Sequence, residues 1–286
     1  MHRILTKREI GPNCFEMTVE ASEIAPKVRA GMFLIIRIDE HGERIPLTFV
    51  NWDAKQGTIT ICFLAIGKTT KHLASLEPGD YIRDIAGPLG NPTHTENYGH
   101  VVCIAGGVGA AEMRPVAQAF KEGGNRVTVI EGARTAGLLI YEEELAEAAD
   151  ELKIATDDGS KGYHGFGIGL LKEMLEAGEK IDLIYTVGPG VMMKAIADAT
   201  RPFGVLTLAS VNPIMIDGTG MCGGCRVEVD GKTRYGCVEG PEFDAHKINW
   251  DVLLSRQRTY VDEEKLSLDR FLSVKEAVKE EAPVAR

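Results

Sequence analysis

Three cysteines near the C-terminal end of the sequence have a spacing that could hold a metal centre. Cys222, Cys225 and Cys237 form a C-x2-C-x11-C pattern. Glycines surround them at positions 218, 220, 223, 224 and 236. Glycine lets the backbone turn tightly around a small inorganic group and direct its N–H groups toward it. Thiolates bind zinc and iron, so this segment predicts a metal or iron–sulfur site.

Asp217 is the candidate for a fourth ligand. Plant-type iron–sulfur proteins space three cysteines as C-x4-C-x2-C, and the residue five before Cys222 is Asp217. A carboxylate can bind iron, so Asp217 and the three cysteines could hold an iron–sulfur cluster. A structural zinc is the alternative, although zinc sites usually pair two C-x2-C knuckles and this segment has one. Asp217 also has a structural interpretation, because acidic residues often form turns.

The other three cysteines predict no chemistry of their own. Cys14, Cys62 and Cys103 each lie in a β-prone apolar run, where a free thiol packs as a small hydrophobe. The N-terminal residues lack the long apolar core of a signal peptide, so a cytoplasmic location is expected. In that reducing compartment structural disulfides are improbable.

A glycine-rich turn could bind the phosphates of a nucleotide. Gly106-Gly-Val-Gly109 follows an apolar strand at 101–105 and precedes a helical pattern at 110–123. A helix N-terminus with glycines allows phosphate to approach the backbone closely. The G-x-G-x-x-G motif is incomplete, because position 112 is Glu, and glycines after strands also make ordinary turns.

Two further turns strengthen that prediction. Gly188-Pro189 follows a strand at 183–187, and an acidic turn containing Asp158 follows a strand at 152–155. Doubly wound sheets bind nucleotides at the carboxyl ends of their strands. The three turns together predict a dinucleotide site.

A second set of polar residues lies in the N-terminal part. In Arg44-Ile-Pro46-Leu47-Thr48, an arginine two residues before a proline could pair with a phosphate, and the Thr48 hydroxyl could hydrogen-bond a ring nitrogen. Arginine on a strand is usually at the surface, and Gly87-Pro88 is usually a turn. The residues alone therefore indicate an anion site only weakly.

The elements that must position these residues change character near residue 98. Before it, short strands at 14–20, 32–38 and 57–64, with one short helix after Gly67, predict an antiparallel β-barrel over 1–97. From 98 to 211, strands and helices alternate, which predicts a doubly wound parallel sheet with helices on both faces. The predicted fold class thus combines α+β and α/β parts.

The remaining residues divide into a cysteine segment and a tail. Residues 212–250 are expected to form a small C-terminal iron–sulfur domain, and 251–286 a polar tail. Within that tail, 275–282 could be a frayed terminal helix or disordered.

Composition excludes several classes of function. The 286 residues include 32 Lys and Arg against 42 Asp and Glu, a net charge of −10. An acidic chain repels phosphate backbones, so no nucleic-acid partner is expected. No apolar run approaches the roughly 18 residues that span a bilayer, so no membrane segment is expected either.

The running order of the motifs resembles that of ferredoxin-NADP reductase-like flavoproteins. The motifs are Arg44-x-Pro-Leu-Thr48, Gly67-Lys-Thr-Thr70, Gly87-Pro-Leu-Gly90, Gly106-Gly-x-Gly109 and Gly188-Pro189. The cysteine segment narrows the resemblance to electron-transfer subunits related to the one serving dihydroorotate dehydrogenase. The chain is most similar to the small subunits of NADH-dependent ferredoxin:NADP oxidoreductases, also called sulfide dehydrogenase small subunits. The dihydroorotate relatives have a cysteine at the position of Asp217, and Ala111-Glu112 replaces the usual Ala-Pro.

The resemblance implies a role for each motif. The barrel would bind FAD through Arg44, Pro46, Leu47 and Thr48, with Thr48, the catalytic candidate, near the flavin N5. The FAD pyrophosphate would lie on Gly67, Thr69 and Thr70, with Gly90 close by. NAD(H) would bind at Gly106, Gly107, Gly109, Asp158, Gly188 and Pro189. A 2Fe–2S cluster would be held by Asp217, Cys222, Cys225 and Cys237.

The resemblance also implies the activity and the partner. The chain would be an oxidoreductase subunit that exchanges hydride with NAD(H) and single electrons with a larger subunit carrying flavin and 4Fe–4S clusters, and through it with ferredoxin. One alternative is an electron-transfer subunit of dihydroorotate dehydrogenase. Another, of a different class, is a non-enzymatic redox-sensing or zinc-stabilised nucleotide-binding module.

Overall fold

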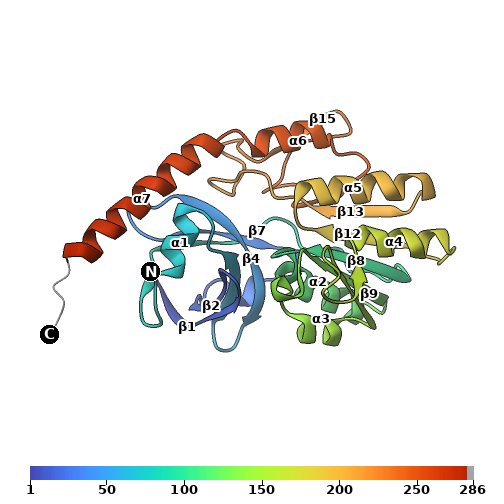
Figure 1. Ribbon diagram of the computed structural model, residues 1–286, viewed down its shortest axis with the longest axis horizontal. Coiled ribbons are helices and arrows are strands. Elements are labelled where there is room, and N and C mark those ends of the chain that lie inside the picture. The colour runs from blue at the N-terminus through green and yellow to red at the C-terminus, as the bar shows by residue number, and fades with distance from the viewer. Residues whose placement is uncertain (282–286) are drawn as a thin grey trace.

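The computed structural model describes residues 1–281 in two sheets and a C-terminal segment that lies across both. Figure 1 shows the N-terminal sheet, in blue and cyan, beside an α/β unit in green and yellow. None of the described helices combines the length and the hydrophobicity needed to span a bilayer.

The N-terminal sheet is a nearly closed antiparallel barrel, as predicted. Its strand order is β6-β1-β2-β5-β4-β3-β7. Alternate residues point inward, so Met17, Leu34, Phe49 and Ile61 are fully buried in one core. The strands are β1 (His2–Gly11), β2 (Cys14–Glu20), β3 (Phe33–Arg37), β4 (Arg44–Asp53), β5 (Thr58–Leu64), β6 (Tyr81–Ile82) and β7 (Asp84–Leu89).

Short helices complete the barrel. The expected helix after Gly67 is α1 (Lys68–Ala74), whose Leu73 is fully buried in the barrel core. A 3-10 turn, η1 (Ala25–Lys27), also packs there through Ala25.

The second sheet is parallel except at one edge. Its order is β11-β10-β9-β8-β12-β13-β16, and only β16 is antiparallel to its neighbour. The strands are β8 (His100–Gly106), β9 (Arg126–Ala133), β10 (Glu151–Thr156), β11 (Tyr163–His164), β12 (Leu183–Val187), β13 (Leu206–Ser210) and β16 (Glu242–Asp244). The chain runs outward from β8 to β11 and then returns to the other side of β8 at β12. A crevice forms at such a switch point, at the carboxyl ends of the strands.

Helices cover both faces of this sheet, which confirms the predicted doubly wound arrangement. Every residue of β8 is buried, because alternate side chains enter two separate cores. One face packs against α2 (Gly109–Glu122) and α3 (Glu142–Ala148), and the other against α4 (Gly167–Glu176) and α5 (Gly190–Thr200). The 3-10 turns η2 (Ala136–Leu138) and η3 (Arg201–Phe203) lie in the connections.

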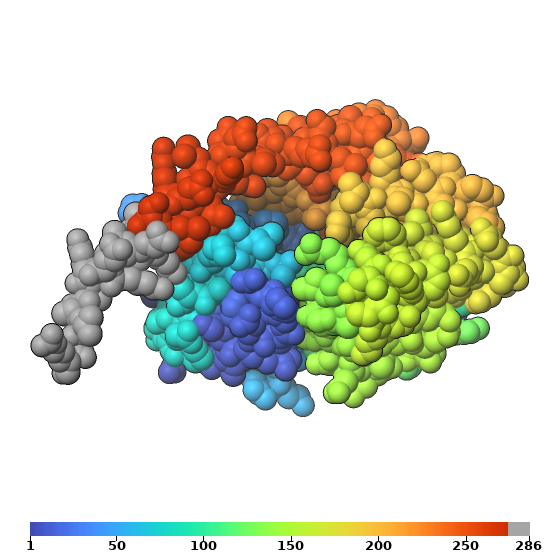
Figure 2. Space-filling model, in the orientation of Figure 1, coloured from blue at the N-terminus to red at the C-terminus, as the bar shows by residue number. Residues whose placement is uncertain are grey.

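The C-terminal segment links the two halves. It contains the hairpin β14 (Arg226–Val229) and β15 (Lys232–Tyr235), contributes β16 to the second sheet, and continues into α6 (Trp250–Gln257) and α7 (Val261–Glu281). Figures 1 and 2 show this segment, in orange and red, crossing from the α/β unit to the barrel. On the barrel side, the Phe271 ring lies 5.8 Å from the His72 ring of α1, centroid to centroid.

The region expected to be a polar tail is therefore helical as far as Glu281. Of the two alternatives for 275–282, the structure supports the helix over 275–281, whereas Ala282 lies outside the described residues.

Candidate functional site

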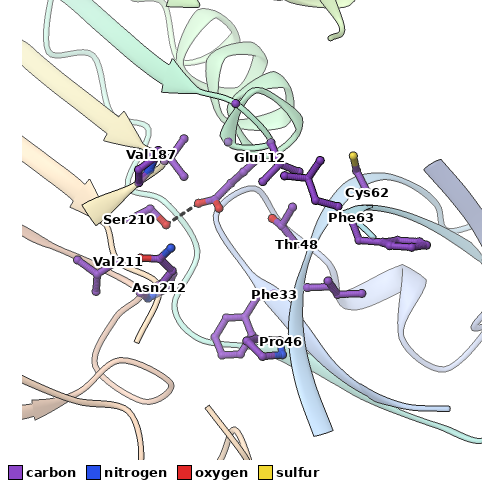
Figure 3. Close-up of a pocket in the computed structure, with 18 of the residues that line it drawn as sticks. Phe33, Pro46, Thr48, Cys62, Phe63, Glu112, Val187, Ser210, Val211 and Asn212 are labelled. Atoms are coloured by element: carbon purple, nitrogen blue, oxygen red, sulfur yellow. Dashed lines mark hydrogen bonds between the residues drawn. The ribbon is translucent and has the colours of Figure 1, made fainter. Parts of the chain in front are cut away.

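A cavity of about 430 Å³ lies between the barrel and the crevice of the second sheet. Pro46, Leu47 and Thr48 of β4 line it from the barrel side. The turns after β8 and β12 line it from the opposite side, with Ser210 at the end of β13. Figure 3 shows these groups converging from separate strands. The cavity is thus built where the two sheets meet.

The barrel wall of the cavity depends on strand register. Thr48 pairs with Phe33 and Pro46 with Ile35, so Phe33, Pro46 and Thr48 face the same space. Proline leaves the strand without an N–H at that point. Arg44 begins the same strand, but its side chain is exposed and does not line the cavity.

Glu43, which belongs to none of the motifs found in the sequence, helps to hold the candidate residues of α1 in place. Thr69 Oγ1 donates to Glu43 Oε2 at 2.6 Å, and Lys68 Nζ lies 3.3 Å from Glu43 Oε1. Burial raises the pKa of Glu43, but these hydrogen bonds outweigh it and the pKa is lowered. Thr70 lines the cavity, whereas Gly67, Thr69 and Gly90 do not.

The glycine turn after β8 has two different structural requirements. A Cβ on Gly109 would lie 2.7 Å from the carbonyl oxygen of Val187, so glycine lets α2 start directly against β12. Gly107 has φ +57°, and a Cβ at this position would have no atom within 4 Å, so its surface faces open space in the cavity. That space is what a bound phosphate would require.

The structure brings most, but not all, of the predicted dinucleotide residues together. Gly106, Gly107, Gly109, Gly188 and Pro189 line the cavity. Asp158 lies in the turn after β10, outside the cavity lining, where its carboxylate accepts hydrogen bonds from the Ser160 backbone and side chain.

Glu112 is a buried acidic group in the wall of the cavity. In the sequence it is noticeable only as a departure from a motif. Glu112, in the first turn of α2, accepts a hydrogen bond from Ser210 Oγ at 2.5 Å. Figure 3 shows it reaching into the space between Ser210 and Thr48. Burial raises the pKa of Glu112 to about 7. The signal in the sequence was a glutamate at a position where the motif has glycine and where the resembling family has proline.

The four candidate metal ligands lie in one loop region as two pairs. Cys222 Sγ is 3.1 Å from Asp217 Oδ1, and Cys225 Sγ is 3.2 Å from Cys237 Sγ. Among the side chains that the structure describes, no three of His, Cys, Asp or Glu are gathered closely enough to hold one metal ion. A 2Fe–2S cluster contains two irons, so two separated pairs suit it better than they suit a single zinc.

Asp217 also organises the loop. Its Oδ2 accepts hydrogen bonds from the Thr219 hydroxyl and the Met221 N–H, both at 2.9 Å. Burial opposes ionisation, but the hydrogen bonds from Cys222, Thr219 and Met221 outweigh it and lower the pKa of Asp217 to about 2. The carboxylate is therefore ionised at neutral pH, in the form that binds metal.

The cysteine loop and the cavity share a wall. Cys225 and Cys237 are buried in one apolar cluster with Phe33, Ile35 and Met215. Phe33 and Met215 also line the cavity. Redox groups bound in the two regions would thus be separated by packed side chains of this cluster.

Comparisons with known proteins agree with this arrangement. Residues 212–249 match the model of the iron–sulfur cluster binding domain of dihydroorotate dehydrogenase B. The Thermotoga maritima homolog of the dihydroorotate dehydrogenase B (NAD(+)) electron transfer subunit is 42% identical, over 95% of this chain and 96% of that protein. A Clostridium beijerinckii protein from the adh 3' region is 45% identical, over 92% of each chain.

A solved structure is similar over almost the whole chain. The structure of an NADH-dependent reduced ferredoxin-NADP oxidoreductase superposes with a TM-score of 0.90 at 41% identity, covering 95% of this chain and 98% of the other. The predicted resemblance is therefore confirmed. The chain belongs to the ferredoxin reductase-like family of dihydroorotate dehydrogenase B electron-transfer subunits and their homologues.

Proposed function

We propose that this chain is the electron-transfer subunit of an NADH-dependent reduced ferredoxin:NADP oxidoreductase. In this role it binds FAD, NAD(H) and a 2Fe–2S cluster and passes single electrons to a larger partner subunit. The observation that carries the proposal is the shared wall of Phe33 and Met215, which joins a nucleotide-sized cavity to a paired set of metal ligands. The similarity to a reduced ferredoxin-NADP oxidoreductase over 95% of the chain supports the choice of partner class.

The barrel residues would hold the flavin. Pro46, Leu47 and Thr48 line the cavity, and the Thr48 hydroxyl is available to hydrogen-bond a ring nitrogen. Arg44, Gly67 at the N-cap of α1, and Thr69 and Thr70 within α1 would contact the pyrophosphate, with Gly90 nearby. For that contact, Thr69 would have to release or share the carboxylate of Glu43. Bound FAD supplies the conversion of two-electron hydride transfer into single-electron transfer.

The turns of the second sheet would position the dinucleotide. The open face of Gly107 lets a diphosphate approach the backbone, and Gly106, Gly109, Gly188 and Pro189 shape the rest of that wall. Asp158, outside the cavity, would contact the more distant part of the dinucleotide. Its carboxylate would accept hydrogen bonds from hydroxyl groups there.

Asp217, Cys222, Cys225 and Cys237 would hold the cluster, with one pair on each iron. The observed pairing of Asp217 with Cys222 and of Cys225 with Cys237 supports this division. The zinc-stabilised module is less well supported, because one zinc would need all four side chains around a single point.

Cofactor analysis of the purified full chain tests the proposal. We expect one FAD and about two iron atoms with matching acid-labile sulfide per chain. A colourless chain with zinc and no flavin would contradict it. Identification of the copurifying subunit separates the ferredoxin:NADP and the dihydroorotate dehydrogenase alternatives. A dihydroorotate dehydrogenase partner would favour the second, which is the role named for a Desulforamulus reducens relative that is 30% identical.

A further inference from the structure

The proposed reaction leaves a proton in a buried place. Oxidation of NADH yields NAD+, two electrons and one proton. Iron–sulfur centres accept electrons alone, so the proton must leave the cavity by another path. This inference rests on the proposed function, which brings NADH and one-electron acceptors to the same chain.

We propose that Glu112 accepts this proton and passes it through the Tyr185 hydroxyl to Glu242. Hydride transfer from NADH to the bound flavin would break the C–H bond of the dihydronicotinamide. When the flavin then returned the two electrons singly to iron–sulfur acceptors, its N–H bond would break, and the released proton would form an O–H bond on the Glu112 carboxylate. The carboxyl group then gives the proton onward, which restores it for the next NADH.

Glu112 lies where such an acceptor is needed. Its side chain lines the cavity, together with Thr48 on one side and Gly107 on the other. Ser210 Oγ donates to Glu112 Oε1 at 2.5 Å and fixes the position of the carboxyl group. Glu112 is thus an ionisable group on the cavity wall between the barrel side and the glycine turn.

The Tyr185 hydroxyl connects Glu112 to a second buried carboxyl group. Its oxygen lies 3.4 Å from Glu112 Oε1 and 3.0 Å from Glu242 Oε1. Tyr185 has one proton to donate, and the shorter contact assigns it to Glu242. A protonated Glu112 can then donate to the Tyr185 oxygen, which gives the chain a direction from the cavity toward Glu242.

The far end of the chain approaches the surface. The Thr93 hydroxyl donates to Glu242 Oε1, and the next residue, His94, is exposed. Burial raises the pKa of Glu242, and the hydrogen bonds from Thr93 and Tyr185 oppose that effect. Glu242 is therefore the member of the pair that is linked through Thr93 to an exposed part of the chain.

The electrostatics of the network formed by Glu112, Tyr185 and Glu242 favour the binding of one proton. Glu112 and Glu242 face each other across Tyr185, and none of the ion pairs between described residues contains either carboxyl group. Other titratable groups interact with Glu242: burial and the charge of Glu242 raise the pKa of Cys103 of β8, and burial, Glu96 and Glu242 raise the pKa of Tyr98. Burial raises the pKa of both glutamates, and that of Glu112 reaches about 7. Two uncompensated buried carboxylates repel each other, so a shared proton stabilises the pair.

Tyr185→Phe tests the relay with little disturbance of packing. The ring keeps its edge contact with Phe120, at 5.8 Å between centroids, and loses only the hydroxyl. Tyr98→Phe is the matched control, because Tyr98 packs against the same Phe120 at 6.2 Å, whereas its hydroxyl donates to the His94 backbone carbonyl rather than to either glutamate. Both variants are made in the full chain with its cofactors.

Proton release is followed with a pH-indicator dye in weak buffer while NADH reduces a one-electron acceptor. We expect Tyr185→Phe to slow proton release at least about tenfold and to enlarge its solvent deuterium isotope effect. Tyr98→Phe should stay within about twofold of wild type. If the Tyr185→Phe variant releases protons at the wild-type rate, the relay is overturned.

A measurement without turnover provides a second test. The infrared spectrum of the full chain should contain a protonated carboxyl band that titrates near neutral pH and is removed by Glu112→Gln. If no such band exists, Glu112 is not the proton acceptor. If NADH fails to reduce the flavin of the wild-type chain, both the proposed function and this inference are overturned. If NADH reduces the flavin normally and Tyr185→Phe releases protons at the wild-type rate, only this inference is overturned.

Discussion

The cavity and the cysteine loop lie side by side but are stabilised in different ways. Most of the cavity wall consists of strand ends whose positions are set by register in two sheets, and its glycine turn is anchored to β12. The loop before Cys225 has no regular structure, and Met221 within it is 87% exposed. Hydrogen bonds to Asp217 hold much of that loop. The shape of the cavity therefore depends on the register of two sheets, whereas the shape of the loop depends on local hydrogen bonds to Asp217.

Cys225→Ala should have the largest effect and should act on the loop alone. It removes one thiolate of the buried pair with Cys237, so we expect complete loss of the iron centre. Flavin content and NADH-dependent flavin reduction should persist, because most of the cavity wall belongs to the two sheets and the turns that follow their strands. Iron analysis and EPR measure the first effect, and anaerobic stopped-flow absorbance the second. Loss of flavin together with iron would show that the two regions are not independent.

Gly107→Val is the converse experiment, directed at the cavity. A side chain in the open space at φ +57° would occupy the predicted diphosphate position, so NADH-dependent flavin reduction should fall by about 100-fold. The cluster EPR signal and FAD content should remain. Gly178→Val is the matched control, because Gly178 also has a positive φ of +77° and open space but lies outside the cavity lining. If NADH reduces the flavin at the same rate in the two variants, the dinucleotide does not bind at this turn.

Arg44→Ala should weaken FAD binding by about 1.5–3 kcal/mol, through loss of a charge-assisted hydrogen bond to phosphate. Equilibrium titration of the flavin-free chain with FAD measures the change. Arg3→Ala, on β1, is a control for loss of a barrel arginine outside the cavity lining. If Arg44→Ala binds FAD with wild-type affinity, Arg44 is a surface residue and the pyrophosphate lies elsewhere.

Substitutions of Asp217 separate its possible role as a ligand from its role in the loop. Asp217→Cys should retain the cluster but shift its EPR g-values and reduction potential, because thiolate is a softer donor than carboxylate. Asp217→Ala removes both the ligand and the acceptor for the Met221 N–H, so the spectrum should change and the cluster should be lost more readily. Unchanged EPR spectra and potentials in both variants would leave Asp217 as a turn former.

Glu131→Gln should have the smallest effect and tests the sheet that supports the cavity. Glu131 is buried in β9, and burial raises its pKa to about 7. The folded state holds this proton to a higher pH than the unfolded state, so its stabilising contribution is full below about pH 4.5 and is lost as the pH rises to about 7. The variant should therefore gain about 1–3 kcal/mol relative to wild type at pH 8 and little at pH 4.5. Urea unfolding at both pH values, with exposed Glu176→Gln as control, measures this difference, and an equal effect at both pH values would contradict it.

Features that depend on local sequence were predictable. The strand at 183–187 has the predicted bounds, and the cysteine spacing placed all four candidate ligands in one region. Alternation of strands and helices was sufficient for the doubly wound sheet, since buried parallel strands are continuous apolar runs.

The buried acidic network was not predictable from the sequence. Glu112 contacts Tyr185 and Ser210, which lie 73 and 98 residues away, and Tyr185 contacts Glu242 at a separation of 57. Each of these residues has an ordinary local context, and only the sheet order brings them together. The same applies to Glu43, whose contact with Thr69 of α1 spans 26 residues of sequence.

Anaerobic addition of NADH to the purified full chain, followed by visible absorption and EPR, tests the central claim most directly. We expect the flavin absorbance to bleach and the EPR signal of a reduced 2Fe–2S cluster to appear in the same sample, because the cavity and the cysteine pairs share the wall formed by Phe33 and Met215. A bleached flavin without a cluster signal in an iron-loaded chain, even after a low-potential reductant has shown the cluster to be reducible, would contradict electron transfer between the two regions.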